Sequence, residues 1–140
     1  MIPSTNIKST RENREIVKFL ENYKAAVEKL SVDAVMELAA KDFHDNVGSE
    51  DPAKHLDYLG LKEKLEKYFP RIKKIFLGMF VQHVAKIEKD KYEVVAYFNK
   101  EFEAEVPAGD KWFSIKEVVR FVIRKTTGNA KYPYEILSGI

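Results

Sequence analysis

The chain has 140 residues, of which 45% are hydrophobic and 33% are charged, so it can bury one core and is not a disordered segment. Its 24 basic and 22 acidic residues are interleaved and leave a net charge of +2. This balance argues against nucleic-acid and membrane-surface partners, which need clustered basic residues. The absence of cysteine excludes disulfides, thiol catalysis and zinc–thiolate sites.

From its N-terminal composition, we expect no secretory signal in the given sequence. Residues 1–14 lack the apolar centre of a signal peptide, and no apolar stretch reaches the roughly 18 residues of a membrane span. A cytoplasmic location is the default expectation, although a processed exported chain would have the same features. Residues 1–8 are polar and include Pro3, so we expect a loose arm before a single domain over residues 9–140.

A long first helix is predicted after this arm. Ser9 and Glu12 have the spacing of a capping box, in which a hydroxyl and a later acid hydrogen-bond across the first turn. Apolar residues then recur with helical spacing: Ile16, Leu20, Tyr23, Val27 and Leu30. Ser31 can cap a second helix over residues 32–40. Residues 42–45 then leave this helix in an extended conformation.

Further helical signals precede the sheet. Asp51 and Pro52 form a favourable helix start, with an acidic cap and proline at the first helical position. Gly60 and Pro70 bracket another helix, because proline cannot continue one. Its apolar stripe consists of Leu61, Leu65, Tyr68 and Phe69. We predict that this stripe lies over the sheet and closes one side of a pocket.

The second half of the chain predicts a sheet of long antiparallel strands. The strands cover residues 72–87, 92–106, 112–125 and 132–140. Short turns join them at residues 90–91, 107–110 and 127–129. Strands of this length indicate a strongly curved sheet. Helices followed by strands are typical of the α+β class, with the N-terminal helices packed on one face of the sheet.

Three polar residues interrupt the apolar faces of consecutive strands: His83, Lys100 and Glu117. Where these faces point inward, the three side chains converge, and a Lys–Glu pair beside a His could bind a polar ligand or transfer protons. The alternative is that they lie near strand ends or that a β-bulge turns them outward.

The opposite face of the sheet also carries apolar residues: Phe76, Phe80, Val84, Val95, Tyr97, Val118 and Val122. Large exposed apolar patches are rare on monomers. We therefore predict a homodimer that buries this outer face.

Several short motifs carry a resemblance to a known family. These are YKAAV at residues 23–27 with SVDAV at 31–35, DFHD at 42–45, GLKE at 60–63 with the later Phe69–Pro70, and YEILSG at 134–139. In this order they resemble the nuclear transport factor 2-like superfamily, in its ketosteroid isomerase and polyketide cyclase-like branch. The resemblance covers nearly the whole chain after about residue 10, and it supports the fold more strongly than the function.

The resemblance implies a cone-shaped sheet with an internal pocket under the helices, and frequent dimers that pack sheet against sheet. In the isomerase branch, a helix tyrosine donates a hydrogen bond to the substrate oxygen, an aspartate carries the proton, and a second acid completes the oxyanion site. Tyr23 matches the tyrosine and Asp45 lies near the aspartate. Val119 is nearest to the second acid, and Glu117 lies one strand repeat earlier on the same face.

Each candidate residue has a structural alternative. Tyr23 can be a helix aromatic that packs on the sheet, and Asp45 can accept hydrogen bonds from nearby backbone N–H groups. His44 and His55 are expected at the surface. Asp42, His44 and Asp45 have no metal-ligand signature, so we expect no metal and no cofactor.

Two functions remain open at this stage. The first is a small-molecule pocket protein, an isomerase-like or cyclase-like enzyme that uses acid–base chemistry. Its catalytic candidates are Tyr23, Asp45, His83 and Glu117, and Lys100 is the candidate for ligand binding. The alternative is a non-catalytic dimeric binding or assembly module with a vestigial pocket. The concave face of the sheet distinguishes the two functions: an open face indicates a ligand pocket, and a face filled by side chains indicates a vestigial one.

Overall fold

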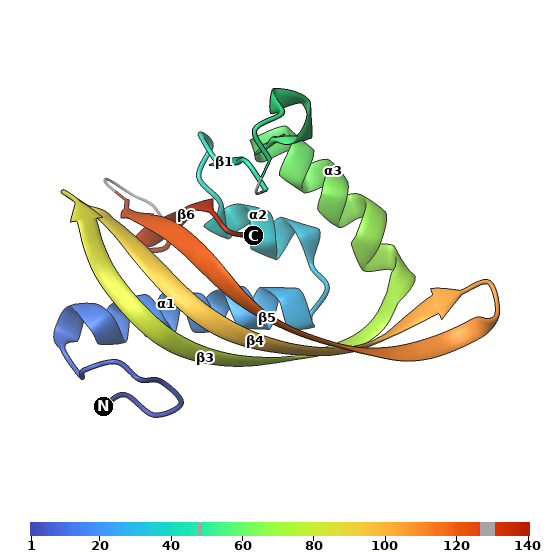
Figure 1. Ribbon diagram of the computed structural model, residues 1–140, viewed down its shortest axis with the longest axis horizontal. Coiled ribbons are helices and arrows are strands. Elements are labelled where there is room, and N and C mark those ends of the chain that lie inside the picture. Colours follow the sequence, from blue (N-terminus) through green and yellow to red (C-terminus); the bar gives the residue numbers. More distant parts are fainter. Residues whose placement is uncertain (48, 127–130) are drawn as a thin grey trace.

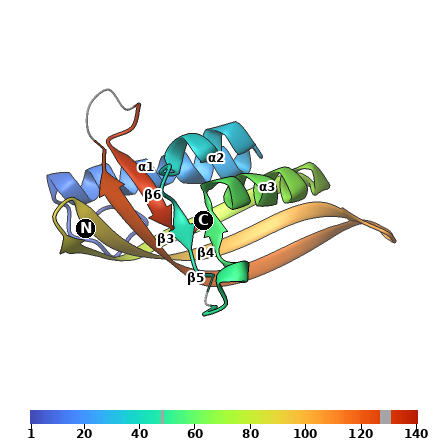
Figure 2. The ribbon, with the colours of Figure 1, turned by 90° about the horizontal axis from the view of Figure 1, so that it is seen from above.

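A computed structural model describes residues 1–47, 49–126 and 131–140. Helices α1 (Arg11–Glu28), α2 (Val32–Leu38) and α3 (Tyr58–Tyr68) lie on the concave side of one curved sheet (Figures 1 and 2). This arrangement confirms the predicted α+β class with helices on a long antiparallel sheet.

The main sheet is an antiparallel meander of four strands in chain order. These are β3 (Ile72–Glu88), β4 (Lys91–Val106), β5 (Gly109–Lys125) and β6 (Tyr134–Ser138). A small second sheet pairs β1 (His44–Asp45) with β2 (Leu56–Asp57). The predicted strand boundaries agree within a few residues, and the predicted turn at 127–129 lies outside the described residues.

The core lies between the helices and the inner face of the sheet. Alternate residues of the strands point inward, since successive side chains of a strand lie on opposite faces. Fully buried residues of the helices, including Ile16 and Leu20 of α1, meet Val94, Phe121 and Ile123 of the strands. The far end of the β4–β5 hairpin extends beyond the helices (Figure 1), so residues 109–116 are all exposed.

Side-chain caps fix where the helices begin. Thr10 accepts from the backbone N–H of Asn13 and starts α1, one residue later than the predicted cap at Ser9. Ser31 caps α2 as predicted, by accepting from the N–H of Ala34, although α2 ends at Leu38 rather than at residue 40.

The start of α3 differs from the prediction. Asp57 caps the helix by accepting from the N–H of Gly60 at 2.7 Å, so Gly60 lies inside the first turn rather than before it. The predicted helix start at Asp51 and Pro52 gives only a single 3-10 turn, η1 (Pro52–Lys54). Pro70 lies in a second such turn, η2 (Phe69–Arg71), which ends α3 as predicted.

The expectation of a loose N-terminal arm is wrong for its second half. The backbone N–H of Asn6 donates to the carbonyl of Val81, and Thr5 forms a β-bridge with Val81 on β3. Thr5 and Ile7 are both buried. The arm therefore covers part of the β3 edge, which would otherwise present unpaired backbone groups. Within the described residues, no helix is both long enough and apolar enough to cross a membrane.

Candidate functional site

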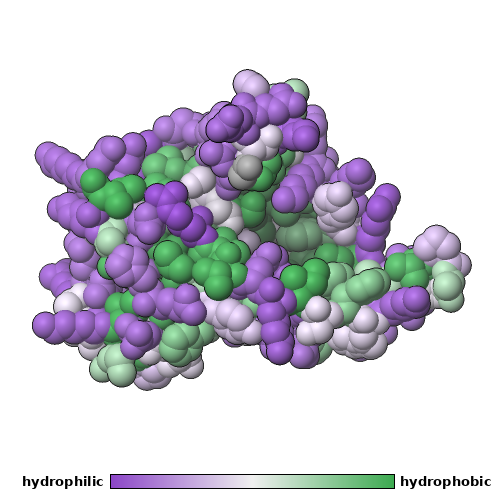
Figure 3. All heavy atoms as spheres, in the orientation of Figure 1, coloured by the Kyte–Doolittle hydropathy of each residue, from purple (hydrophilic) through white to green (hydrophobic). Residues whose placement is uncertain are grey.

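A cavity of about 590 Å³ opens on the inner side of the sheet, between α3 and the projecting end of β4 and β5. Figure 3 shows this hollow with hydrophobic side chains inside and hydrophilic ones around it. Its lining is mostly apolar: Val27, Val35, Leu65, Phe69, Ile72, Ile75, Leu77, Phe98, Phe102, Phe113, Ile115, Val119 and Ile140. A cavity of this size fits a ring-bearing small molecule.

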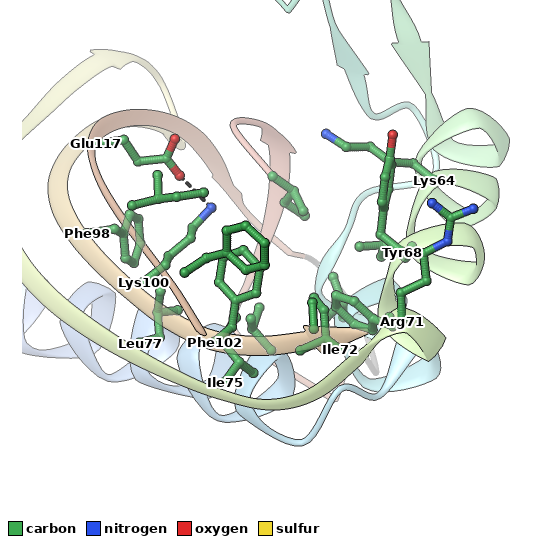
Figure 4. A pocket seen from close by; sticks show the side chains of 18 of the residues that line it. Lys64, Tyr68, Arg71, Ile72, Ile75, Leu77, Phe98, Lys100, Phe102 and Glu117 are labelled. Carbon is green, nitrogen blue, oxygen red and sulfur yellow. Dashed lines mark ion pairs between the residues drawn. The ribbon is translucent and has the colours of Figure 1, made fainter. Parts of the chain in front are cut away.

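Helix α3 forms one wall of the cavity. Leu61 is fully buried and Leu65 is 8% exposed, so the predicted stripe holds the helix on the core. Positions one helical turn apart share a face, which places Lys64 and Tyr68 beside the cavity mouth (Figure 4). Lys64 and Arg71 were not among the predicted site residues, although they lie close in sequence to Leu65 and Phe69 of the predicted apolar stripe.

Lys100 and Glu117 meet on the opposite wall (Figure 4). The register pairs Phe98 with Glu117 and Lys100 with Ile115, so the two polar side chains are diagonal neighbours on the inner face. Their Nζ and Oε1 atoms are 2.5 Å apart, and the side chains are 32% and 39% exposed. The expected proximity of this pair is therefore found, and the pair faces an open cavity rather than a dry core.

Tyr23 reaches the same cavity from α1. Its ring packs edge-to-face on Phe98 and Phe121, at centroid distances of 6.3 and 5.3 Å. Burial raises the pKa of Tyr23 above its ordinary value, and the negative charge of Glu117 raises it further. The hydroxyl therefore keeps its proton at neutral pH. Tyr23 combines the packing role of the structural alternative with a position where its hydroxyl can serve as a donor.

His83 does not join this pair, which corrects the predicted trio. Val81 lies opposite Ala96, but His83 lies opposite Val95, so β3 contains one extra residue at Gln82. This β-bulge turns His83 to the outer face, where it is exposed. It also turns Val84 inward, so Val84 packs against the core and is not part of the outer face.

Asp45 lies outside the cavity lining and has a structural role. Its Oδ1 accepts from the N–H of Val47 and its Oδ2 accepts from the N–H of Gly139, both at 2.7 Å. Both carboxylate oxygens are thus occupied by backbone donors. The alternative of a backbone acceptor is what the structure has, and Asp45 is not among the residues that line the cavity.

His44 and His55 lie beside each other. Their Nε2 and Nδ1 atoms are 3.1 Å apart across β1 and the start of β2, and Nε2 of His55 lies 2.7 Å from the carbonyl of Ser49. The described residues contain no group of three or more His, Asp or Glu side chains that could hold a metal ion.

A double-mutant cycle tests whether the Lys100–Glu117 pair interacts in solution. We expect Glu117→Gln and Lys100→Met each to lower stability, and the double variant to recover about 0.5–1 kcal/mol, as for partly exposed pairs. Chemical denaturation of the four proteins measures this coupling. Additivity within about 0.3 kcal/mol would show that the two charges do not meet.

No protein-family model matches this sequence, and no curated protein matches it. Solved structures do match over most of the chain. A ketosteroid isomerase-like protein from Erwinia carotovora atroseptica has a TM-score of 0.71 at 14% identity, covering 92% of this chain and 93% of that one. A candidate dehydratase of the NTF2-like family from Streptomyces avermitilis has a TM-score of 0.68 at 13% identity, covering 91% and 93%.

A conserved protein from Planctomyces limnophilus is similar to the same extent, with a TM-score of 0.71 at 10% identity over 92% of this chain and 98% of that one. These likenesses confirm the resemblance at the level of the fold: the chain has the nuclear transport factor 2-like, cystatin-like α+β fold. At these identities the neighbours give no assignment of function, which depends on the residues of the cavity.

Proposed function

We propose that this protein binds a ring-bearing small molecule with a carbonyl oxygen in the cavity between α3 and the sheet, and acts on it by acid–base chemistry. The observation that carries the proposal is the open cavity of about 590 Å³, apolar for most of its lining, in which Tyr23, Lys100 and Glu117 supply the polar groups on the inner walls. Pockets of this kind use a few placed polar groups to orient a largely apolar ligand.

The roles follow from the chemistry of each group. Glu117 is the proton acceptor, because a carboxylate beside the ligand can remove a proton next to a carbonyl. Tyr23 donates a hydrogen bond to the carbonyl oxygen as negative charge develops there, since its raised pKa keeps the hydroxyl protonated. Lys100 orients the Glu117 carboxylate through their ion pair and contributes positive charge to the same wall.

This assignment differs from the isomerase pattern. In that branch the proton carrier follows the second helix, but here the corresponding Asp45 holds the backbone of Gly139. Val119 occupies the place nearest to the late-strand acid and lines the cavity as an apolar residue. We therefore assign the acid–base role to Glu117 and leave Asp45 and His83 out of the chemistry.

The similar proteins described as isomerase-like and as a candidate dehydratase lend support to an enzyme of this kind, although each name describes that protein alone. The open cavity favours the small-molecule hypothesis over an assembly module with a vestigial pocket, because a vestigial pocket would be filled by side chains.

Exchange of carbonyl-adjacent protons tests this proposal without knowledge of the natural substrate. In heavy water, the protein should bind a cyclic aromatic ketone such as tetralone and exchange these protons faster than buffer does, as followed by proton NMR. Glu117→Gln should lower the rate by about 10²–10⁴-fold, the usual contribution of a general base. Tyr23→Phe should lower it by about 10²-fold, the loss of one oxyanion donor.

The outcomes separate the two functions. Binding with exchange at the buffer rate would support a binding module and contradict the enzyme. Failure of every ring ketone to bind would contradict the proposal as a whole. A circular dichroism melt of each variant serves as the control that the loss does not come from unfolding.

We also propose that the protein forms a homodimer through the outer face of the sheet. Phe76, Phe80 and Val118 are 58%, 40% and 62% exposed there. Phe76 stacks on Trp112 with ring planes 10° apart, which extends the apolar surface along the hairpin. Sheet-to-sheet packing would bury these exposed side chains, and large exposed apolar patches are rare on monomers.

Sedimentation at micromolar concentration should give the mass of a dimer, and Val118→Glu should shift the protein toward a monomer, because it places a charge in an apolar interface. Leu59→Glu, at an exposed leucine of α3 on the other side of the molecule, is the matched control and should leave the mass unchanged. A wild-type monomer at all concentrations would contradict the dimer.

A further inference from the structure

The mouth of the cavity is lined by polar groups that the chemistry proposed above does not use. Lys64 and Tyr68 come from α3, and Arg71 comes from the turn that follows it. Figure 4 shows these three side chains together on the α3 side of the cavity, with Lys100 and Glu117 on the opposite wall. Between the two polar walls lie apolar side chains, among them Phe102 and Phe113, whose rings stack at a centroid distance of 5.3 Å.

We call the residues Lys64, Tyr68 and Arg71 the rim of the cavity. Its two cations, Lys64 and Arg71, have no carboxylate partner among the described residues. Lys100, the third cation in the lining, is paired with Glu117, and Lys62 on the same helix reaches Glu66 at 3.9 Å. No described acid forms an ion pair with Lys64 or Arg71. Their charges are therefore available to a ligand at the mouth.

One acid in the lining could weaken the attraction of an anionic ligand to Lys64 and Arg71. Glu105 lies at the far end of β4, close to the hairpin turn. Lys73 lies near Glu105. Its hydrogen bond to Asp110 raises the pKa of Lys73, and the charges of Glu103 and Glu105 raise it further. With Glu117 paired to Lys100, the lining as a whole has an excess of one positive charge, and that excess lies on the α3 side.

We propose that the ligand of this cavity is an amphipathic anion: a ring system on the apolar walls, with a carboxylate, sulfate or phosphate at the rim between Lys64 and Arg71. Arginine can bind such a group through two parallel N–H donors, and lysine adds a mobile point charge. The Tyr68 hydroxyl lies on the same side as a further donor. This inference rests on the proposed function, since it names the class of ligand for the same cavity.

A matched pair of ligands tests the proposal. Naphthalene carboxylate and naphthalene carboxamide have the same ring and nearly the same shape but differ in charge. Isothermal titration at low ionic strength should show the carboxylate binding about three- to tenfold more tightly, because each partly exposed ion pair contributes modestly. The preference should shrink at about 0.5 M salt, where exposed charges are screened.

Substitutions at the rim test which residues cause the preference for the carboxylate. Lys64→Met and Arg71→Met together should abolish the difference between the two ligands, because they lower the affinity for the carboxylate more than the affinity for the carboxamide. Lys62→Met removes an equal charge from α3 at a position outside the lining, and it should keep the preference. This control separates a local contact from the overall charge of the protein.

Each result has one meaning. Equal affinity of the wild type for the two ligands would overturn the anion rim while leaving the cavity as a binding site. Absence of binding by both ligands would contradict the proposed function itself. A preference that survives in the Lys64→Met, Arg71→Met variant would assign the anion to another site and overturn the proposal.

Discussion

Leu61→Ala should lower the free energy of unfolding by about 2–5 kcal/mol, because it removes a fully buried side chain and leaves a cavity. Leu65→Ala should fall in the lower part of this range, since Leu65 lines the cavity and the space it vacates joins an existing hollow. Denaturation in urea measures both changes. They test whether α3 is held on the core as a wall of the cavity.

Leu59→Ala is the matched control on the same helix. Leu59 is 66% exposed, so the same substitution should change stability by no more than about 0.5 kcal/mol. Similar losses at Leu59 and Leu61 would mean that α3 does not have this orientation, and the cavity would then have a different wall.

The second large effect is expected at Asp45. Asp45→Ala removes both acceptors of the Val47 and Gly139 N–H groups, and charge-assisted hydrogen bonds of this kind are stronger than neutral ones. We expect a loss of about 2–3 kcal/mol in the free energy of unfolding. Gly139 and its neighbour Ile140 both line the cavity, so this hydrogen bond fixes a segment of the cavity wall.

Asp51→Ala provides the comparison. Asp51 accepts a single local hydrogen bond from Ala53 at the exposed η1 turn, so its removal should cost about 0.5–1 kcal/mol. If Asp45→Ala is as stable as wild type but loses proton exchange with the ketone, Asp45 has a catalytic role and its assignment as a structural acceptor is wrong.

The elements of this fold could be predicted because their signals are local. Ser31 is followed by an apolar helix face and caps α2, and Pro70 lies in the turn that ends α3. The long alternation of β4 is regular, and Tyr92, Val94, Ala96 and Phe98 are all buried. Local patterns of this kind depend little on tertiary contacts.

The composition of the site was only partly predictable. The proximity of Lys100 and Glu117 could be predicted, because β4 and β5 pair without a break over their whole length. The predicted inward position of His83 was wrong. The prediction assumed a strand that alternates without interruption, but the bulge at Gln82 exchanges the two faces of β3 beyond it. The change of the apolar face from Val81 to Val84 was a signal for this bulge, but Ala85 and Ile87 continue the original alternation and conceal it.

The roles of Asp45, Lys64 and Arg71 could not be predicted, because they depend on contacts between parts of the chain that are far apart in the sequence. The hydrogen bond from Gly139 to Asp45 joins residues far apart in the sequence, so no pattern near either residue indicates it. Lys64 and Arg71 are ordinary surface residues by sequence. Only the placement of α3 opposite the β4–β5 hairpin makes them part of a cavity.

We propose that the cavity between α3 and the sheet binds a ring-bearing small molecule through Tyr23, Lys100 and Glu117. A crystal structure of the protein soaked with tetralone tests it most directly. We expect the ring between Phe102 and Leu65 and the ketone oxygen within hydrogen-bond distance of the Tyr23 hydroxyl. Ligand density found only on the outer face of the sheet, with this cavity empty, would contradict it.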